Sequence, residues 1–438
     1  MLRVCLSLPL VLPLLAAPVF AQAVDLTEKA APDDQARFVI GLELKGHLVV
    51  TQDGRKDAIR LEATARHVFS DRTVAVADGL PSLSVRAYEE ASLAATVGGE
   101  RTVQRLPADR RLVVARRHPD GLFCFALGGR LSRDELDLVG EHFNPQCLPG
   151  LLPGRVVNVG DTWTLSDAAA QAAARLDTVI KNRLTGRLTD LKDDTATFSV
   201  EGTAEGVEDG AHVVLSVAAV GSLDRAAGRI RTLTWKQKDE RDPGPVTPAS
   251  VVEVVVSLRR EPLAAKVQAL ADEVVATVPR GEVPPELADL RYTDPKGRYS
   301  LTYPRDWHVT GQTDSHLVMR LLDKGDYLAQ ATISVWRKVP PGGHTPAEDF
   351  KRAIANAPGW TATKVLADGE VPAGPGRRLY RLTAEGKIDE LPVVQTFYLL
   401  SGPQGDQVAV TVTVRPDKLK LLGRRDLDLV RAIDFAGR

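Results

Sequence analysis

The sequence predicts an α+β fold with two domains. The first is an antiparallel β-rich domain (a meander, a sandwich or a half-barrel), and the second is a smaller antiparallel sheet flanked by helices. The first domain covers residues 24–262, in which apolar residues recur with a period of two from Phe38 to about Arg260, and short turn sequences separate the apolar runs. Residues 263–287 then form a proline-rich break before the pattern changes. The 438 residues suffice for two or three domains that each bury a core.

The composition is that of an ordinary globular protein, with 44% apolar and 26% charged residues. Lys and Arg number 56 and Asp and Glu number 57, so the formal net charge is −1. This balance gives no electrostatic reason to expect nucleic acid or an anionic membrane as a partner. The chain is also too apolar and too close to neutral to be disordered throughout.

Residues 1–23 have the features of a secretory signal peptide. Arg3 precedes an apolar run over 8–15, and Ala21 and Ala23 form the small-x-small pattern of a cleavage site. Prolines interrupt the run, which is shorter than the roughly 20 apolar residues that a membrane-spanning helix needs. We therefore expect cleavage after Ala23, export to the periplasm or the cell exterior, and no membrane-spanning segment in the mature protein.

Two cysteines remain after that cleavage, Cys124 and Cys147. In an oxidising compartment an even count favours a disulfide, and we predict that these two residues form one. The alternative is a pair of buried thiols, since reduced cysteine behaves as a small apolar side chain. No CxxC motif and no Cys/His set with zinc-ligand spacing is present, so we expect no metal and no cofactor.

Hairpins dominate the first domain. Apolar residues alternate over 42–50, residues 52–55 form a turn, and the alternation resumes over 59–65. The same pattern of strand, turn and strand predicts further elements at 112–116, 122–127, 184–191, 196–202, 212–220, 229–237 and 251–258. Because short turns join neighbouring strands, the strands are expected to be antiparallel.

Two helices and a linker interrupt or end this series. Ser132 and Glu135 form a capping box, and Ser166 precedes an alanine-rich stretch over 168–176. Residues 263–275 read as a third helix, which prolines and glycines follow up to residue 287. We expect this linker to separate the domains and to be cut by proteases near Arg280.

The second domain, residues 288–438, has its strands between two helices. Strands are predicted at 299–303, 317–322, 332–336, 378–384, 393–400 and 408–414, with helices starting near Thr345 and covering 427–433. The segment Gly297–Trp307, GRYSLTYPRDW, resembles the opening of the PsbP-like/DcrB-like superfamily of α/β/α domains. The resemblance implies a non-catalytic module that binds or stabilises other proteins. The turn containing Pro304 and Trp307 is suited to closing a core edge with the indole.

The first domain is similar in layout to secreted bacterial proteins of unassigned activity that contain an LLP…VxVGDxW element. That element here is Leu151–Trp163. Its Gly160 and Asp161 are expected to form a turn that presents Trp163 to the sheet, which is a structural role.

One sequence trio invites a catalytic interpretation, Asp314, Ser315 and His316. In an extended segment the first and third side chains project to one face and the second to the other, whereas a triad is assembled in space from separate segments. No G-x-S-x-G elbow is present, so we predict a solvated loop and no catalytic residues.

The remaining polar candidates also favour structural roles. His67 lies in the apolar phase of its strand, His118 lies in a turn, and His142 shares a helix face with Glu135 but lacks the further ligands of a metal site. The charge run 236–242, KQKDERD, is predicted to be a solvated strand end, with a binding rim as the alternative. No phosphate-binding glycine motif and no interleaving of aromatic and basic residues is present.

The sequence thus predicts an exported, non-catalytic protein of the cell envelope that acts as an interaction or scaffold module, with an envelope protein as partner of the second domain. The alternative is a carrier that holds an apolar ligand such as lipid inside the curved β-domain. A hydrolase without a recognised motif is the third possibility, because fold alone does not exclude activity. Whether the β-domain is filled or hollow separates the first two.

Overall fold

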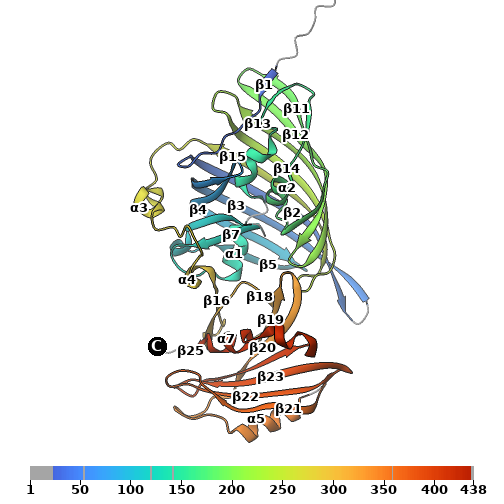
Figure 1. Cartoon of the computed structure of the whole chain (residues 1–438), viewed down its shortest axis with the longest axis vertical. Helices are drawn as coiled ribbons and strands as arrows, with labels where there is room; N and C mark the ends of the chain where they lie inside the picture. The colour runs from blue at the N-terminus through green and yellow to red at the C-terminus, as the bar shows by residue number, and fades with distance from the viewer. Residues whose placement is uncertain (1–22, 53–54, 119–120, 141–142, 358, 436–438) are drawn as a thin grey trace, which may run out of the picture.

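A computed structural model describes residues 23–52, 55–118, 121–140, 143–357 and 359–435 (Figure 1). Apart from Ala23, the predicted signal peptide lies outside these residues. The described residues form an α+β fold, as predicted, with one large antiparallel sheet above and a smaller one below in Figure 1.

The large sheet has 13 strands in the order β7-β6-β4-β3-β2-β15-β14-β13-β12-β11-β9, while β5 also pairs with β4 and β10 with β12. Every pair is antiparallel, and the meander of β11 to β15 follows the predicted hairpins. The strands are β2 (Gln35–Gln52), β3 (Arg55–Ala77), β4 (Leu80–Val97), β5 (Glu100–Arg105), β6 (Leu112–His118), β7 (Gly121–Ala126), β9 (Thr162–Thr164), β10 (Thr178–Asn182), β11 (Thr185–Lys192), β12 (Thr195–Glu208), β13 (Ala211–Asp224), β14 (Arg229–Arg241) and β15 (Ala249–Glu261).

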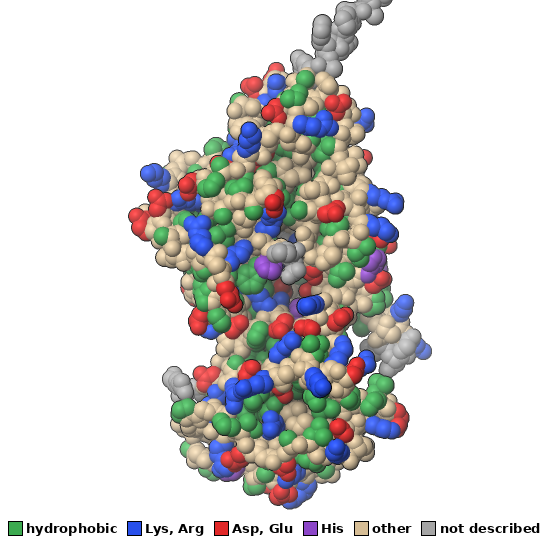
Figure 2. Space-filling model, in the orientation of Figure 1, with side chains coloured by type: hydrophobic (Ala, Val, Ile, Leu, Met, Phe, Trp, Pro, Cys, Tyr) green, Lys and Arg blue, Asp and Glu red, His purple; other side chains and the backbone are tan. Residues whose placement is uncertain are grey.

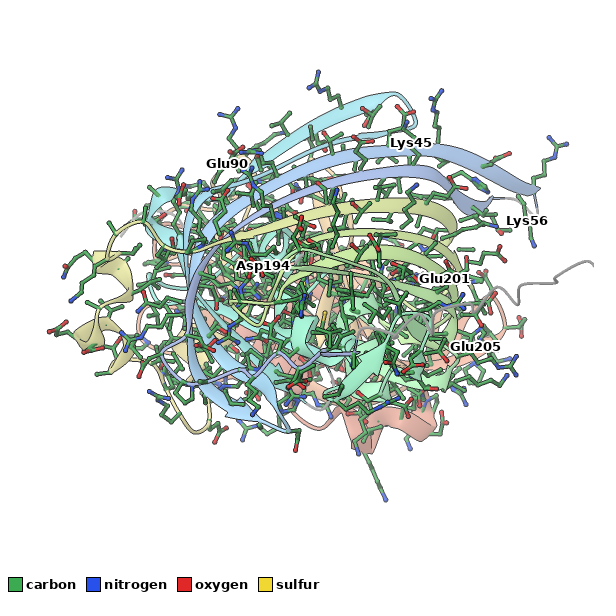
Figure 3. All side chains as sticks on the ribbon, turned by 90° about the horizontal axis from the view of Figure 1, so that it is seen from above. Lys45, Lys56, Glu90, Asp194, Glu201 and Glu205 are labelled. Carbon is green, nitrogen blue, oxygen red and sulfur yellow. The ribbon has the colours of Figure 1, made fainter. Side chains whose placement is uncertain are left out.

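The sheet curves into an open half-barrel, and its outer face carries charged side chains such as Lys45 and Glu90 (Figure 3). Its concave face is filled by the segment between β7 and β10 (Figure 1). This segment contains α1 (Arg133–Gly140), η2 (Pro145–Leu151), α2 (Asp167–Ala174) and β8 (Val156–Asn158), which pairs with β1 (Ala23–Asp25). The rings of Phe143 and Trp235 illustrate the packing, with centroids 5.4 Å apart.

Both predicted helix starts carry the expected hydrogen bonds. The backbone N–H of Ser132 donates to Glu135 Oε2 at 2.8 Å, and the N–H of Glu135 donates to Ser132 Oγ at 3.1 Å. Ser166 Oγ accepts from the N–H of Ala169 at 3.2 Å. These reciprocal bonds satisfy backbone donors that the first turn of a helix leaves free.

The segment after β15 differs from the prediction. Instead of a helix over 263–275 it contains only η3 (Gln268–Leu270) and α3 (Asp272–Val275). Its apolar side chains pack on the outer face of the sheet, where Leu270, Val275 and Val278 are buried against β4, β6 and β7. The apolar residues of this largely extended segment pack on the sheet face, whereas the sequence predicted that residues 263–275 form a helix.

The second domain contains a sheet in the order β18-β19-β20-β24-β23-β22-β21 and a smaller sheet in the order β16-β17-β25. In Figure 1, α5 covers the sheet face away from the first domain and α7 the face toward it. The elements are α4 (Pro285–Ala288), β16 (Leu290–Thr293), β17 (Tyr299–Tyr303), β18 (Trp307–Gln312), β19 (His316–Asp323), β20 (Asp326–Trp336), α5 (Ala347–Ala355), β21 (Trp360–Val371), β22 (Arg378–Ile388), β23 (Leu391–Ser401), β24 (Gln407–Val414), η4 (Pro416–Lys418), α6 (Leu419–Leu422), α7 (Arg425–Arg431) and β25 (Ile433–Phe435).

Candidate functional site

A cavity of about 450 Å³ lies where the first domain meets the start of the second. Basic and acidic side chains gather around a hollow near the middle of the face shown in Figure 2. The described residues that line the cavity with charge are Asp78, Arg117, His118, Arg133, Asp137, Arg175, Asp177, Glu208, Asp209 and Arg305. Its apolar lining includes Leu122, Leu136, Ala172 and Leu176.

Helix α1 supplies one wall. Arg133, Leu136, Asp137 and Gly140 all line the cavity, and their spacing of three and four residues places them on one helix face. The capping box at Ser132 fixes where that helix begins, and therefore which of its residues face the cavity.

Helix α2 contributes a positive charge to the cavity through its C-cap residue, Arg175. Arg175 has left-handed backbone angles, φ +57° and ψ +36°, and its N–H donates to the carbonyl of Gln171. A Cβ atom on Gly140 would lie 3.4 Å from a guanidinium nitrogen of Arg175. The glycine therefore gives the arginine side chain room to pass beside α1.

Two arginines tie the second domain to this cavity. The guanidinium of Arg305 lies 3.9 Å from the centroid of the Phe123 ring and donates to the carbonyls of Cys124, at 2.6 Å, and Ala288, at 2.7 Å. Burial lowers the pKa of Arg305 to about 10. Arg133 donates in turn to the carbonyl of Arg305 at 3.1 Å, so the two cations are held by backbone oxygens.

Three aspartates supply negative charge. Asp137 is exposed to the solvent of the cavity, and its pKa is raised because surrounding protein desolvates the carboxylate, which Arg133 and Arg175 partly oppose. Burial likewise raises the pKa of Asp177, whose Oδ2 accepts from the N–H of Asp209 at 2.8 Å. Such enclosed carboxylates gain from a nearby cation.

The other acidic groups of the cavity are engaged with cations. Glu208 forms an ion pair with Arg241, whose pKa is lowered mainly by burial and further by the charge of Arg175. Asp78 lies 3.6 Å from Arg117 at the rim.

The predicted structural residues lie in the fold as follows. Gly160 has φ +96°, and the N–H of Asp161 donates to the Asn158 carbonyl in the turn that precedes β9. Trp163 is buried, and its Nε1 donates to the carbonyl of Leu151 at 3.0 Å.

The Pro304–Trp307 turn also places an indole in a core. Trp307 is 1% exposed, and its N–H donates to the Pro304 carbonyl at 3.2 Å.

The trio at 314–316 does not converge on one site. Asp314 pairs with Lys296 at 2.8 Å, and His316 Nδ1 lies 2.9 Å from Ser334 Oγ. Both contacts are exposed and lie away from the residues that line the cavity.

The histidines and the charge run considered as candidate sites lie in different environments. His67 is buried, His118 lines the cavity, and His142 lies outside the described residues. The prediction that the run 236–242 is wholly solvated was wrong. All but its last residue belongs to β14, where alternate side chains face inward and Asp239 is half-buried. Alternation in a strand applies to polar residues too, so a run of charges need not be wholly solvated.

The structure has Cys124 and Cys147 as buried thiols, so the disulfide predicted from the sequence is not formed in it. Cys124 Sγ contacts the carbonyl of Val139 at 3.8 Å. Sequence spacing does not fix the separation and direction of two Cβ atoms, on which a disulfide depends.

Two further findings concern the described part of the chain. It contains no group of three or more His, Cys, Asp or Glu side chains that could hold a metal ion. Within the same residues, no helix has the length and apolar character needed to cross a membrane.

No sequence pattern pointed to the residues that define the cavity. Arg133, Asp137, Arg175 and Arg305 come from three separated segments, and each is an ordinary charged residue in its local pattern. The capping box at Ser132 was the one available signal, since it located the helix that carries the first two.

Comparison with known proteins identifies no family. No protein-family model matches the sequence, and no curated protein matches it. Among solved structures, cyanobacterial PsbP (CyanoP) from Synechocystis sp. PCC 6803 is 16% identical with a TM-score of 0.26, and the match covers 36% of this chain and 99% of that one. The Ran-binding protein Mog1p of Saccharomyces cerevisiae is 12% identical with a TM-score of 0.27, covering 34% of this chain and 95% of that one.

Two other similar structures are larger than the matched region. A protein from Bacteroides thetaiotaomicron VPI-5482 is 11% identical with a TM-score of 0.25, over 34% of this chain, which spans about half (48%) of that protein. Lipovitellin is 8% identical with a TM-score of 0.30, over 54% of this chain and 26% of that one. A PsbP protein is thus among the structural neighbours, but at these TM-scores none of the similarities supports a function.

Proposed function

We propose that the protein is an exported, non-catalytic binding protein whose ligand occupies the cavity of its first domain beside Arg305. The observation that carries this proposal is the cavity itself. Its volume of about 450 Å³ falls in the range typical of small-molecule sites, and it lies at a domain junction, where such sites are common. Residues 1–23 support the export part of the proposal by their signal-peptide pattern.

The character of the lining supports binding of a polar molecule. Guanidinium and carboxylate groups surround the cavity, and several of them have no side-chain partner of opposite charge. The cysteine of the lining, Cys124, contacts a backbone carbonyl and is 1% exposed, which is unfavourable for a nucleophile.

The packing of the concave face argues against a lipid carrier. The place that a lipid would take inside the curved sheet is filled by η2, α2 and the residues around them, including Phe143, Leu148 and Leu151, each at most 1% exposed. The cavity that remains lies at the end of this core and is lined largely by charges.

The interaction hypothesis derives less support from the second domain. Its exposed edge strand β21 displays Val365 and Leu366, 57% and 40% exposed, which suits the addition of a partner strand. However, β21 is interrupted by two bulges and carries the exposed Lys364, and both features protect sheet edges from pairing. We therefore prefer the cavity.

Native mass spectrometry of the full mature chain, purified without denaturation from the exported fraction, tests the proposal. We expect a protein mass that begins at Val24 and a bound polar small molecule that is released on unfolding. The variant Ala172→Trp fills the cavity with an indole and should lose that molecule, whereas Val214→Trp on the outer face of β13 should keep it.

Three outcomes would contradict the proposal. A bound lipid in the native protein would favour the carrier alternative. A ligand that Ala172→Trp retains would place the binding site elsewhere, and a native protein that carries no small molecule at any stage of purification would count against a binding function.

A further inference from the structure

Charges of both signs line the cavity without neutralising one another. The cations Arg133, Arg175 and Arg305 and the anions Asp137, Asp177 and Asp209 all belong to the lining. No two of these six side chains form an ion pair within 4.0 Å, although Asp137 is close enough to Arg133 and Arg175 for their charges to act on its pKa. The cavity is therefore dipolar and close to neutral.

The partners that these groups do have are backbone atoms. Arg305 donates to the carbonyls of Cys124 and Ala288, and Arg133 donates to those of Arg305 and Trp307. Backbone carbonyls accept hydrogen bonds but do not cancel the charge of a guanidinium.

Three of the six side chains, those of Arg175, Asp137 and Asp209, have no hydrogen-bond or ion-pair partner among the described residues. The guanidinium of Arg175 makes no hydrogen bond and no ion pair with them, although the left-handed C-cap of α2 holds it beside Gly140. The carboxylate of Asp137, on α1, also makes no hydrogen bond and no ion pair with them, and it remains exposed to the cavity. In addition, the Nε of Arg133 is buried and donates no hydrogen bond among the described residues.

Unpaired charges in a partly desolvated site are costly unless a ligand or water engages them. A single ion of either sign would satisfy one set of charges and repel the other, because cations and anions line the same space. A ligand that carries both an ammonium and a carboxylate engages both sets at once.

From this arrangement, and resting on the proposed binding function, we infer that the ligand is a small zwitterion of the short-peptide class. Its carboxylate would lie at Arg175, and its ammonium at Asp137 and Asp209. A guanidinium suits a carboxylate because its planar donors match the two oxygens.

The size and apolar part of the lining favour a peptide of two or three residues over a single amino acid. Leu122, Leu136, Ala172 and Leu176 line the same cavity and offer surface for side chains between the charged ends. The raised pKa values of Asp137 and Asp177, which arise mainly from desolvation, agree with a site where a bound ammonium would stabilise the ionised carboxylates.

Isothermal titration calorimetry with the full mature chain, freed of ligand by unfolding and refolding, tests the inference. The probes are the dipeptides Ala-Ala, Ala-Leu and Ala-Phe, each also with an acetylated amino end and, separately, with an amidated carboxyl end. We expect at least one free dipeptide to bind, and each blocked form of it to bind at least tenfold more weakly, since each loses one charged contact.

Two variants assign the ends of the peptide. Arg175→Gln should weaken the free dipeptide at least tenfold but leave the already weak binding of the amidated form nearly unchanged. Asp137→Asn should weaken binding of the free dipeptide at least tenfold but leave the already weak binding of the acetylated form nearly unchanged. Arg231→Gln, on β14 at 43% side-chain exposure, is the matched control and should leave binding unchanged. Equal melting temperatures of all variants establish that each is folded.

The outcomes separate this inference from the proposed function. Equal binding of free and blocked dipeptides, or tighter binding of free alanine and leucine than of any dipeptide, overturns the peptide zwitterion. No heat from any probe, while native mass spectrometry still finds a small molecule in the cavity, overturns the ligand class and leaves the binding function standing. Loss of both signals overturns both.

Discussion

The two halves of the large sheet differ in how many of their faces are covered. In the half formed by β12 to β15 only the inner face is buried, and β13 alternates buried and exposed residues along most of its length. In the half formed by β3, β4, β6 and β7, both faces are covered, and eight successive residues of β3, His67–Val74, are buried. The alternation of apolar and polar residues in a strand is therefore clear only where one face of the strand is exposed to water.

The second cover is the segment that the sequence marked as a linker. Leu270, Val275 and Val278 pack on the outer face of β4, β6 and β7. Arg116 on β6 donates to the carbonyls of Gly281, at 2.5 Å, and Pro279. A proline-rich connection can thus be part of the core when its apolar residues find a sheet face.

The largest effect is expected from Arg86 in the doubly covered half. This arginine is 0% exposed and lies 3.4 Å from Asp71, 3.0 Å from Asn144 and 5.0 Å from the Phe69 ring centroid. Arg86→Ala leaves a buried carboxylate without its cation, and we expect a loss of about 3–5 kcal/mol in the free energy of unfolding. Urea denaturation measures it.

The matched change in the singly covered half is Arg231→Ala. Its side chain is 43% exposed and lies 3.9 Å from Asp224, so we expect a change within about 0.5 kcal/mol. Similar losses for Arg86→Ala and Arg231→Ala would remove the energetic distinction between the two halves.

The next effect concerns the cover itself. Leu270→Ala removes a side chain that is 1% exposed between the linker and the sheet, and we expect it to cost about 2–3 kcal/mol of linker docking. Because each 1.4 kcal/mol is a factor of ten in an equilibrium constant, tryptic cleavage near Arg280 should become at least tenfold faster.

This prediction also decides between two expectations for the wild type. The sequence predicts cleavage near Arg280, whereas the docked linker, in which Arg280 donates to the Val74 carbonyl at 3.2 Å, predicts resistance. Val220→Ala, at a residue 55% exposed on the outer face of β13, should leave the cleavage rate unchanged. Rapid cleavage of the wild type at this position would show that the cover is not held.

The smallest effect comes from the inner face of the singly covered half. Burial raises the pKa of Asp239 on β14 to about 6, although a hydrogen bond from Gln237 Nε2 at 2.7 Å opposes the shift. Because the folded-state pKa exceeds the unfolded value of 3.8, the folded protein binds the extra proton between about pH 4 and 6. Stability from this group therefore falls as the pH rises through that window.

Asp239→Asn should remove this pH dependence and stabilise the protein by about 1–2 kcal/mol at pH 7, since no ionised group remains to be desolvated. Denaturation curves at pH 4, 6 and 7 measure the change. Glu240→Gln, whose side chain is 60% exposed, is the control and should leave the curve's pH dependence as in the wild type. An unchanged pH profile in Asp239→Asn would mean that Asp239 is effectively solvated.

Sequence patterns located those elements that depend only on a few consecutive residues. The reciprocal bonds of Ser132 and Glu135 depend on four consecutive residues, and the hairpins between β11 and β15 on single turns. The strand β4 and the end of β3 were missed, because burial on two faces removes the alternation that identifies a strand. The strand β5 was missed for the opposite reason, since nearly all of its residues are exposed and it has no buried apolar face.

The cavity was beyond reach for a different reason. Arg133 and Asp137 lie on a helix whose polar residues normally face water, and Arg305 lies in a turn of the other domain. Nothing in the neighbourhood of each residue distinguishes it from a surface charge. Only the packing of α1 and α2 in the first domain, with Arg305 of the second beside them, brings them together.

By itself the sequence determined the antiparallel strands, their turns and the starts of the helices, since periodicity and capping act over a few residues. The tertiary structure alone decided that β2 pairs with β15, residues separated by about 200 positions, where Arg37 and Glu261 form an ion pair at 2.9 Å. It also decided that residues 263–287 cover one half of the sheet and that charges from separate segments line one cavity. The physical reason is that a local pattern records whether a side chain is hidden from water, but not which distant segment hides it.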